Sequence, residues 1–348
     1  MQTEIKYYNE QDRLNTMRIR KIQNELPKFC KKYFRSIEQT TSTRTRLGYA
    51  YDIRTFFEYL QTINPDIKKS KLSDISIDIL EAVSREDIEE YLEYLSLYHK
   101  NDSTISNSEQ GKKRKMSALR NMYSYFCKAE MVSKNPAELV SMPKLHENEI
   151  IRLEPNEVAI LLDQVESGEH LSKAQLKYHA KTKLRDTTII TLLLGTGIRV
   201  SECVGLDLND IDFDNNGMHI HRKGGNNTVI YFPDEVRTLL IEYIEQRKSI
   251  ITCEGSEHAL FLSLQHKRIT VKAVENLVKK YAQKVTTVKK ITPHKLRSTF
   301  GTNLYRQSGD IYLVADVLGH KDINTTRKHY AAQDDENRRR AAKMVKLR

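Results

Sequence analysis

The sequence contains few cysteines and no long hydrophobic segment. Cys30, Cys127, Cys203 and Cys253 are far apart and form no CxxC pair, so no disulfide scaffold is expected, and each is most simply a reduced, buried thiol. The longest apolar stretch, 189–194, is far too short to span a bilayer. The N-terminus mixes both charge signs and lacks the apolar region of a secretion signal. These absences exclude membrane and secreted classes and favour a soluble cytoplasmic protein.

Glycine is scarce in the first part of the chain. Only Gly48 and Gly111 precede residue 168, and the other eleven glycines lie from Gly168 onward. A long stretch poor in glycine and rich in Lys, Glu, Leu and Tyr predicts an all-helical region, whereas the later part has the turns of a mixed domain.

The length of 348 residues suggests two domains. Three prolines bracket a polar segment near the middle, and X-Pro units disfavour helix and extend the chain. We therefore expect a helical domain over 1–140, a linker over 141–152 and a mixed domain over 153–348.

Apolar periodicity predicts the helices of the first domain. A charged leader helix is expected over 12–38, within a leader segment 1–39 that shows no hairpin signal. The next helix carries one apolar stripe from Tyr49 to Leu60. A third begins at Ser84 with a sequence typical of a capping box, and a fourth runs over about 110–129.

The net charge leaves a polyanionic partner open. The chain has 57 Lys and Arg against 46 Asp and Glu, a formal net charge of +11. Clustered basic side chains gain free energy by releasing phosphate counterions, although a merely basic cytosolic protein fits the charge equally well. Two basic helix starts could lie on DNA, although the longer run alone is more simply a solvated helix edge. The residues concerned are Arg44, Arg46, Lys112, Lys113, Arg114 and Lys115.

The second domain shows a different pattern. After a helix that begins near Pro155, a charged loop over 168–186 is expected to lead into a buried apolar run that ends at the Gly195-Thr-Gly197 turn. The segment 218–232, with its Gly-Gly-Asn-Asn turn, predicts a β-hairpin. Residues 234–348 are expected to form helices separated by short turns.

Two short segments of the second domain present arginine at a helix start. Arg199 follows the glycine turn and could offer its planar guanidinium to a phosphate, with Glu202 holding it in place. Thr292-Pro293 predicts a helix N-terminus whose first turn carries His294 and Arg297 on one face. A proton carrier beside an anion ligand is what phosphoryl chemistry requires, but surface ion pairs and exposed first turns look the same in sequence.

A third segment contains Leu318-Gly-His320 and, further on, Tyr330. Gly319 is expected to end the preceding helix, which places His320 at that helix end. Taken alone, Tyr330 is an ordinary packing residue, and Lys223 at the hairpin tip is an ordinary solvent-exposed residue.

Together these positions resemble the catalytic set of the tyrosine recombinases, the phage integrase family. The resemblance covers nearly all of 150–335, and the phrases TGIRVSE, HRKGG, TPHKLRSTFGT and DIYLVADVLGHKDINTTRKHYAA are closest to the Xer-type branch. Within that branch they are most similar to the single-recombinase Xer proteins of streptococci and to related mobile-element integrases. The set is Arg199, Lys223, His294, Arg297, His320 and Tyr330.

The resemblance implies a fold that is mainly α with a small β-sheet. A helical, SAM-like core-binding domain would precede a mixed α/β catalytic domain. It also implies double-stranded DNA as the substrate, a homotetramer on that DNA, and a septal DNA translocase as a possible partner in Xer systems. A C-terminal helix within the tail DDENRRRAAKMVKLR would dock on a neighbouring protomer, although a frayed basic tail fits those residues as well.

The resemblance also implies a role for each residue. Tyr330 would attack the scissile phosphate and form a 3′-phosphotyrosyl bond, so that neither ATP nor a metal is needed. His294, alone or together with His320, would accept the phenol proton, and Arg199 and Arg297 would clamp the phosphate oxygens. Lys223 would protonate the 5′-oxygen leaving group. His320 would hydrogen-bond the same phosphate, and Glu202 would serve as support.

Two departures from the family pattern stand out. Tyr330 lies one residue further from His320 than expected, and His329 occupies the expected place; one residue rotates a helical position by about 100°. Ser298 stands where many relatives carry a second histidine.

Metal binding is a poor interpretation of the remaining histidines. His219 and His221 alternate along one strand but have no third ligand at a zinc spacing. Both are expected to be half-buried strand residues, and no cofactor is expected.

Three functions remain to be separated. A DNA-binding regulator without chemistry would not need all six catalytic positions filled. A relaxing topoisomerase would act as a monomer on any sequence. Among recombinases, the single helical pattern of the leader segment favours an Xer-type resolvase of chromosome or plasmid dimers over a mobile-element integrase, which often carries an extra N-terminal domain with strands.

Overall fold

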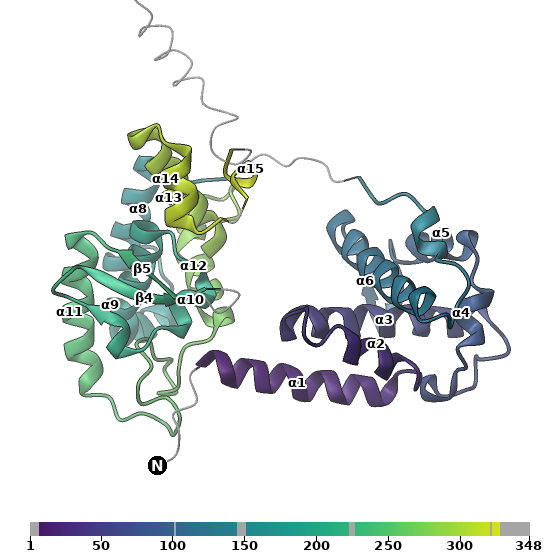
Figure 1. The fold of residues 1–348 in the computed structure, drawn as a ribbon. Helices are drawn as coiled ribbons and strands as arrows, with labels where there is room; N and C mark the ends of the chain where they lie inside the picture. Colours follow the sequence, from purple (N-terminus) through teal and green to yellow (C-terminus); the bar gives the residue numbers. More distant parts are fainter. Residues whose placement is uncertain (1–6, 101, 145–150, 223–226, 321, 328–348) are drawn as a thin grey trace, which may run out of the picture. The chain divides into compact units, whose positions relative to one another are not determined.

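The computed structural model describes residues 7–100, 102–144, 151–222, 227–320 and 322–327 (Figure 1). The chain divides into two compact units, Met1–Glu147 and Asn148–Arg348. Part of the expected linker, 145–150, lies outside the described residues. Among the described residues, no helix combines the length and apolar character needed to cross a membrane.

The first unit is built from helices and one small hairpin. In chain order its elements are α1 (Tyr7–Glu25), α2 (Cys30–Ser36), α3 (Thr43–Ile63), η1 (Leu72–Asp74), α4 (Asp78–Ala82), α5 (Arg85–Tyr94), β1 (Tyr98–Lys100), β2 (Ser103–Ile105), α6 (Glu109–Lys128) and α7 (Pro136–Leu139). The antiparallel pair β1–β2 was not expected from the sequence. The helix α3 packs against both α1 and α6.

The predicted apolar faces form the core of this unit. Ile53, Phe56 and Phe57 of α3 are fully buried with Met122 and Phe126 of α6. Burying side chains of this size contributes about 1.5–3 kcal/mol each to folding. The Ser84 capping box is confirmed, because the Ser84 hydroxyl accepts from the backbone N–H of the third helical residue, whose carboxylate accepts from the Ser84 N–H.

The single leader helix over 12–38 is wrong. The chain instead forms α1 and α2, separated at Leu26–Pro27. Proline disfavours helical geometry in the residue before it and has no N–H to continue the hydrogen-bond ladder, so the helix ends there despite a continuous amphipathic pattern.

The basic start of α6 is tied to a buried carboxylate of α3. Asp52 is fully buried, and its Oδ1 accepts from the Lys115 ammonium at 2.9 Å, while Arg114 binds Oδ2. Only 7% of the Lys115 side chain is exposed. This ion pair cross-links α3 and α6 inside the helical unit.

Removing Asp52 should therefore destabilise the protein strongly. Asp52→Ala leaves the Lys115 ammonium buried without its partner, which we expect to lower the free energy of unfolding of this unit by about 3–5 kcal/mol. The double variant Asp52→Ala/Lys115→Met should recover much of that loss, because no charge then remains buried. Denaturant unfolding of the wild-type protein and the two variants measures both values; an Asp52→Ala variant within about 1 kcal/mol of wild type would contradict this role of Asp52.

The second unit combines helices with a three-stranded antiparallel sheet of order β3-β4-β5. Its elements are α8 (Pro155–Ser167), α9 (Lys173–Thr196), α10 (Val200–Gly205), η2 (Leu208–Asp210), β3 (Ile211–Asp212), β4 (Gly217–His221), β5 (Asn227–Tyr231), α11 (Asp234–Lys248), α12 (Val271–Val285), α13 (Pro293–Ser308), α14 (Ile311–Leu318) and α15 (Ile323–Thr326). The helix α9 packs against α8, α11 and α13 (Figure 1).

The charged loop predicted over 168–186 is wrong from Lys173 onward, where α9 begins. Ser172 caps this helix and forms a capping box with Gln175. The charged run remains helical because part of it is bound internally: the buried Asp186 carboxylate accepts from the Tyr281 hydroxyl at 3.1 Å and pairs with Lys280. A local pattern does not reveal such distant partners.

The turns and the hairpin around the site follow the prediction. Gly197 and Gly319 end α9 and α14 in the left-handed conformation, with φ of 63° at each. Strands β4 and β5 pair antiparallel, with Met218 opposite Ile230. The last part is less regular than expected, because a long connection of turns, bends and isolated bridges over 249–270 joins α11 to α12.

Two expectations on burial need correction. Cys30 and Cys203 are buried free thiols, but Cys127 and Cys253 are only half-buried. His219 is exposed rather than half-buried, because Met218 and Ile220 take the inward face of β4.

Candidate active site

The candidate active site is organised around the C-terminal end of α14. Three elements bring arginine side chains to this helix end: the start of α10, the first turn of α13 and the end of β4. The backbone carbonyls at a helix C-terminus lack intrahelical partners and carry partial negative charge, which favours cations there.

Arg199 is held by a buried carboxylate. It is the N-cap of α10, directly after the left-handed turn at Gly197, and its backbone N–H donates to Glu202 at 2.8 Å. Its Nη1 donates to the other oxygen of the same carboxylate at 2.8 Å, and Nη2 donates to the Gly319 carbonyl at 3.3 Å. Glu202 is 5% exposed, whereas 37% of the Arg199 side chain reaches solvent. The guanidinium is therefore fixed but open to an anion.

Arg297 is buried and connects two turns. Its Nη1 donates to the Gly197 carbonyl at 2.6 Å, and its Nη2 donates to the Leu318 carbonyl. Only 4% of the residue is exposed. The two arginines therefore share the Gly197 turn and the end of α14 through backbone contacts.

The two histidines lie at helix ends, as the sequence predicts. His294 is exposed in the first turn of α13, where Thr292 is the N-cap and Pro293 the first helical residue. His320 follows Gly319, and its Nδ1 shares a 2.8 Å hydrogen bond with the hydroxyl of the buried Thr326 in α15. This bond fixes the orientation of the His320 ring.

Ser298 has an internal role in α13. It is buried, and its hydroxyl donates to the His294 carbonyl at 3.1 Å. The position that departs from the family pattern therefore binds the backbone of the helix start.

Lys223, His329 and Tyr330 lie outside the described residues. The stem of the hairpin that carries Lys223 is described, and it closes with a 2.7 Å hydrogen bond between His221 Nδ1 and Asn227 Oδ1. The roles expected for Lys223 and Tyr330 remain predictions.

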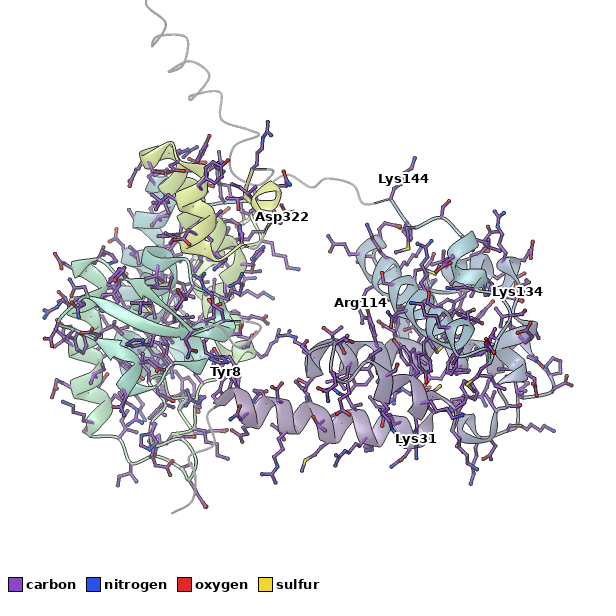
Figure 2. The ribbon with its side chains drawn as sticks, viewed as in Figure 1. Tyr8, Lys31, Arg114, Lys134, Lys144 and Asp322 are labelled. Atoms are coloured by element: carbon purple, nitrogen blue, oxygen red, sulfur yellow. The ribbon has the colours of Figure 1, made fainter. Side chains whose placement is uncertain are left out.

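The expected DNA-contact residues of the first unit do not form one exposed surface. Arg44 and Arg114 are exposed, and Figure 2 labels Arg114. Arg114 also binds Asp52. Arg46 is 11% exposed and pairs with Glu38 at 3.0 Å. The prediction that the longer basic run is a solvated helix edge is therefore partly wrong.

Of the other members of this run, Lys112 and Lys115 are bound within the unit. The Lys112 ammonium donates to the Ser96 hydroxyl at 2.8 Å, Lys113 is half-buried, and Lys115 is buried in the ion pair described above. DNA contacts by these residues remain predictions.

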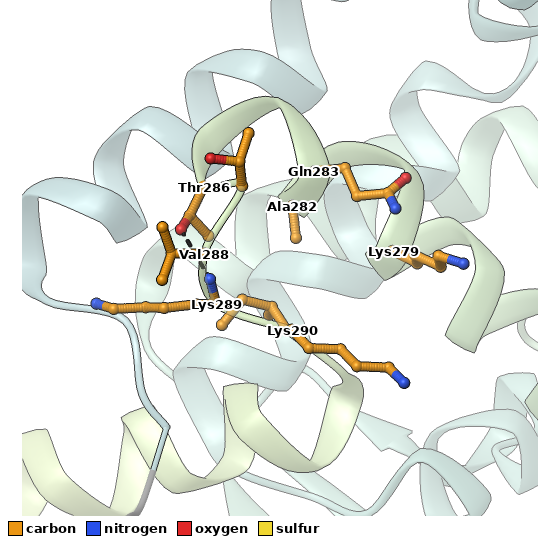
Figure 3. Close-up of a pocket in the computed structure, with 9 residues that line it drawn as sticks. Lys279, Ala282, Gln283, Thr286, Val288, Lys289 and Lys290 are labelled. Carbon is orange, nitrogen blue, oxygen red and sulfur yellow. Dashed lines mark hydrogen bonds between the residues drawn. The ribbon is translucent and has the colours of Figure 1, made fainter.

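A lysine-lined pocket beside α13 was missed in the sequence. It has a volume of about 530 Å³ and lies between the end of α12 and the segment that leads to Thr292. Figure 3 shows the ammonium groups of Lys279 and Lys290 extending to the same side, whereas Lys289 extends the opposite way. Lys289 pairs with Glu157 at 2.5 Å. The signal in the sequence was the pair of lysines just before the Thr-Pro-His motif.

Neither a cysteine nucleophile nor a metal centre is indicated among the described residues. Burial raises the pKa of the Cys203 thiol in α10 to about 12, so this thiol stays protonated and is a poor nucleophile. Among the residues that the structure describes, no cluster of three or more His, Cys, Asp or Glu has a metal-binding arrangement.

Comparison with known proteins decides the family. A family model described as "Phage integrase family" matches residues 152–337, more than half of the chain. The chain belongs to the phage integrase family. It is a tyrosine recombinase, an enzyme that cleaves and rejoins DNA strands.

Curated relatives match over nearly their whole length. The recombinase is 33% identical over 317 residues to tyrosine recombinase XerC of Caldanaerobacter subterraneus subsp. tengcongensis, covering 88% of this chain and 82% of that protein. It is 29% identical over 353 residues to tyrosine recombinase XerS of Streptococcus pneumoniae, covering 92% and 96%.

Solved structures show the same fold. The XerH site-specific recombinase, in its pre-cleavage complex with difH, matches with a TM-score of 0.62 at 20% identity, covering 87% of this chain and 80% of that one. The Tn1549 transposon integrase, in complex with circular intermediate DNA, matches with a TM-score of 0.63 at 22% identity, covering 91% and 99%. The mainly helical fold with a small sheet, predicted from the sequence, is confirmed.

Proposed function

We propose that this recombinase resolves chromosome or plasmid dimers in the manner of Xer proteins. The observation that carries the proposal is the meeting of Arg199, Arg297 and the Gly319–His320 turn at the end of α14. Two fixed guanidinium groups beside a histidine suit the binding of one phosphate between them.

Cleavage on this proposal is one displacement at phosphorus. The Tyr330 oxygen forms a bond to the scissile phosphorus while the bond to the 5′-oxygen breaks, which leaves the DNA 3′ end joined to the protein. A phenol with a pKa near 10 needs a proton acceptor, and His294 takes that role. Lys223 gives its proton to the departing 5′-oxygen, so charge does not build up there.

The arginines stabilise the charge that builds on the non-bridging oxygens. Glu202 holds the exposed Arg199 guanidinium ready, so little reorganisation is needed when the phosphate arrives. Arg297 acts from a buried position, where electrostatic interactions are stronger than in water. His320, oriented by Thr326, hydrogen-bonds the same phosphate.

The remaining parts of the proposal concern assembly on DNA. The helical unit serves as the core-binding domain and the second unit as the catalytic domain, and four protomers act together on two DNA sites. Lys279 and Lys290, on one side of the pocket beside α13, add phosphate contacts near the catalytic helix. A septal DNA translocase is the partner class that dimer resolution calls for, and the cytoplasm is the compartment that we propose for an enzyme acting on chromosome or plasmid dimers.

The choice between dimer resolution and mobile-element integration rests on the curated relatives. The fold does not discriminate, because XerH and the Tn1549 integrase match it equally well. The two curated relatives described above are Xer proteins matched over 82% and 96% of their own lengths. This favours the Xer role over the integrase alternative.

A plasmid assay tests the proposed function. The substrate is a supercoiled plasmid with two direct copies of an inverted repeat taken from beside the gene. We expect the purified enzyme to resolve it into two circles, and a one-site plasmid to stay intact. Relaxation of any plasmid by monomeric enzyme would indicate a topoisomerase, and binding without strand exchange would indicate a regulator; either result contradicts the proposal.

A further inference from the structure

Three arginines bind four consecutive carbonyl groups at the end of α14. Arg222 donates to Asp316 O at 3.4 Å and to Val317 O at 2.7 Å. Arg297 donates to Leu318 O, and Arg199 donates to Gly319 O at 3.3 Å. Two of these arginines belong to the proposed catalytic set, and Arg222 does not.

Arg222 lies where strand β4 passes into the turn of the hairpin. It directly follows β4, and the hydrogen bond between His221 and Asn227 closes the stem just before it. Its guanidinium reaches across to α14, so the turn end of the hairpin is tied to the helix end that carries His320. The next residue in the chain is Lys223.

Gly319 is shaped to receive this side chain. A Cβ atom at Gly319 would overlap the Arg222 guanidinium, and the φ of 63° there also disfavours any side chain. Both the Arg222 side chain and the backbone conformation therefore favour glycine at position 319.

The placement of Arg222 is electrostatically costly. Burial lowers the pKa of the Arg222 guanidinium; nearby Arg199 acts in the same direction, and the Glu202 carboxylate opposes both. Within the described part of the chain, the buried Arg222 Nε has no hydrogen-bond partner. A surface arginine could avoid these costs in water, so its position on α14 calls for a compensating role.

We propose that Arg222 is a positioning residue for strand cleavage. It fixes the turn end of the β4–β5 hairpin on the end of α14, directly before Lys223 in the sequence, and so supports the proton transfer to the leaving 5′-oxygen that the proposed function assigns to Lys223. It acts through backbone carbonyls and does not bind the phosphate. The inference rests on the proposed function, because it assumes that Lys223 is the general acid.

A change of leaving group separates this role from phosphate binding. In the natural reaction the bond between phosphorus and the 5′-oxygen breaks, and that oxygen takes a proton. If sulfur replaces that bridging oxygen, the leaving group is a thiolate whose conjugate acid has a pKa of about 8.5, so it departs without a proton. Loss of the general acid, or of its positioning, should then no longer slow cleavage.

The experiment measures single-turnover cleavage of matched oxygen and 5′-bridging sulfur substrates. Arg222→Ala and Lys223→Ala should each slow cleavage of the oxygen substrate about 10²–10³-fold and cleave the sulfur substrate at close to the wild-type rate. Arg199→Ala should stay defective on both substrates. Arg222→Lys should recover only part of the loss, because an ammonium cannot reproduce the fork of the guanidinium.

A structural control comes from another arginine that binds carbonyls. Arg268 donates to Val204 O at 3.1 Å and to Leu206 O at 2.9 Å, at the C-terminal end of α10. Arg268→Ala should lower thermal stability without a selective rescue by sulfur. If Arg222→Ala fails to fold, Arg222→Gln keeps donor groups at the site and takes its place.

The outcomes are distinct. An Arg222 variant equally slow on both substrates, while Lys223→Ala is rescued by sulfur, would overturn the positioning role and leave the proposed function intact. An Arg222 variant that cleaves the oxygen substrate at the wild-type rate would overturn it as well. If Lys223→Ala is not rescued, Lys223 is not the acid, and both the inference and that part of the proposed function fail.

Discussion

Arg199→Ala is expected to reduce strand cleavage by at least about 10³-fold, while DNA binding is retained. The Arg199 guanidinium reaches solvent and is already oriented by Glu202, so it can meet the charge that develops on the phosphate oxygens. Ground-state binding is shared among many phosphate contacts along the duplex, and one contact contributes little of it.

The control for this variant removes an equal charge elsewhere in the same unit. Arg237 lies in α11, where its guanidinium stacks over the Phe213 ring at 5.9 Å from the centroid. Arg237→Ala should cleave at close to the wild-type rate. Cleavage on a nicked duplex and a gel mobility assay measure the two quantities; equal losses of binding and cleavage in Arg199→Ala would assign Arg199 to binding instead.

Tyr330→Phe is expected to abolish cleavage and recombination completely. The change removes only the phenolic oxygen, which is the atom that forms the bond to phosphorus. Without it the covalent intermediate cannot form. DNA binding should persist, because the ring is kept.

Tyr312 provides the matched control for that change. It lies at the start of α14, whose opposite end forms the candidate site, and it is 73% exposed. Tyr312→Phe should recombine normally. His329 occupies the expected place of the nucleophile. If the Tyr330→Phe variant still cleaves DNA, the register of the motif has been misassigned.

Local sequence signals predicted the elements that present the site. Gly197 and Gly319 were correctly predicted as helix ends, because a left-handed residue after an apolar run is best filled by glycine. Thr292-Pro293 correctly marked the start of α13, and the glycine-rich turn between β-prone segments marked β4 and β5. Each of these signals lies within a few residues of the structure it specifies.

The errors arise where distant residues decide the outcome. Lys115 seemed a solvated helix edge, but its partner Asp52 lies 63 positions earlier and draws it into the core. The stretch 173–186 seemed a charged loop, but Tyr281 and Lys280 bind Asp186 from another helix. The role of Pro27 was local and could have been read from the sequence.

Arg222 was missed for a related reason. Its partners are backbone carbonyls at residues 316 and 317, and carbonyl groups are present in every sequence. Only the fold shows which of them come together. The one local signal was an arginine directly before Lys223, which also fits an ordinary basic turn.

During cleavage, Tyr330 is expected to become covalently bound to DNA. Wild-type enzyme is incubated with a nicked suicide duplex, from which the short fragment beside the cut diffuses away, and the trapped adduct is digested and sequenced by mass spectrometry. We expect a peptide with a nucleotide linked through phosphate to Tyr330, and no adduct from Tyr330→Phe. An adduct on another residue, or none from wild type on the cognate site, would contradict it.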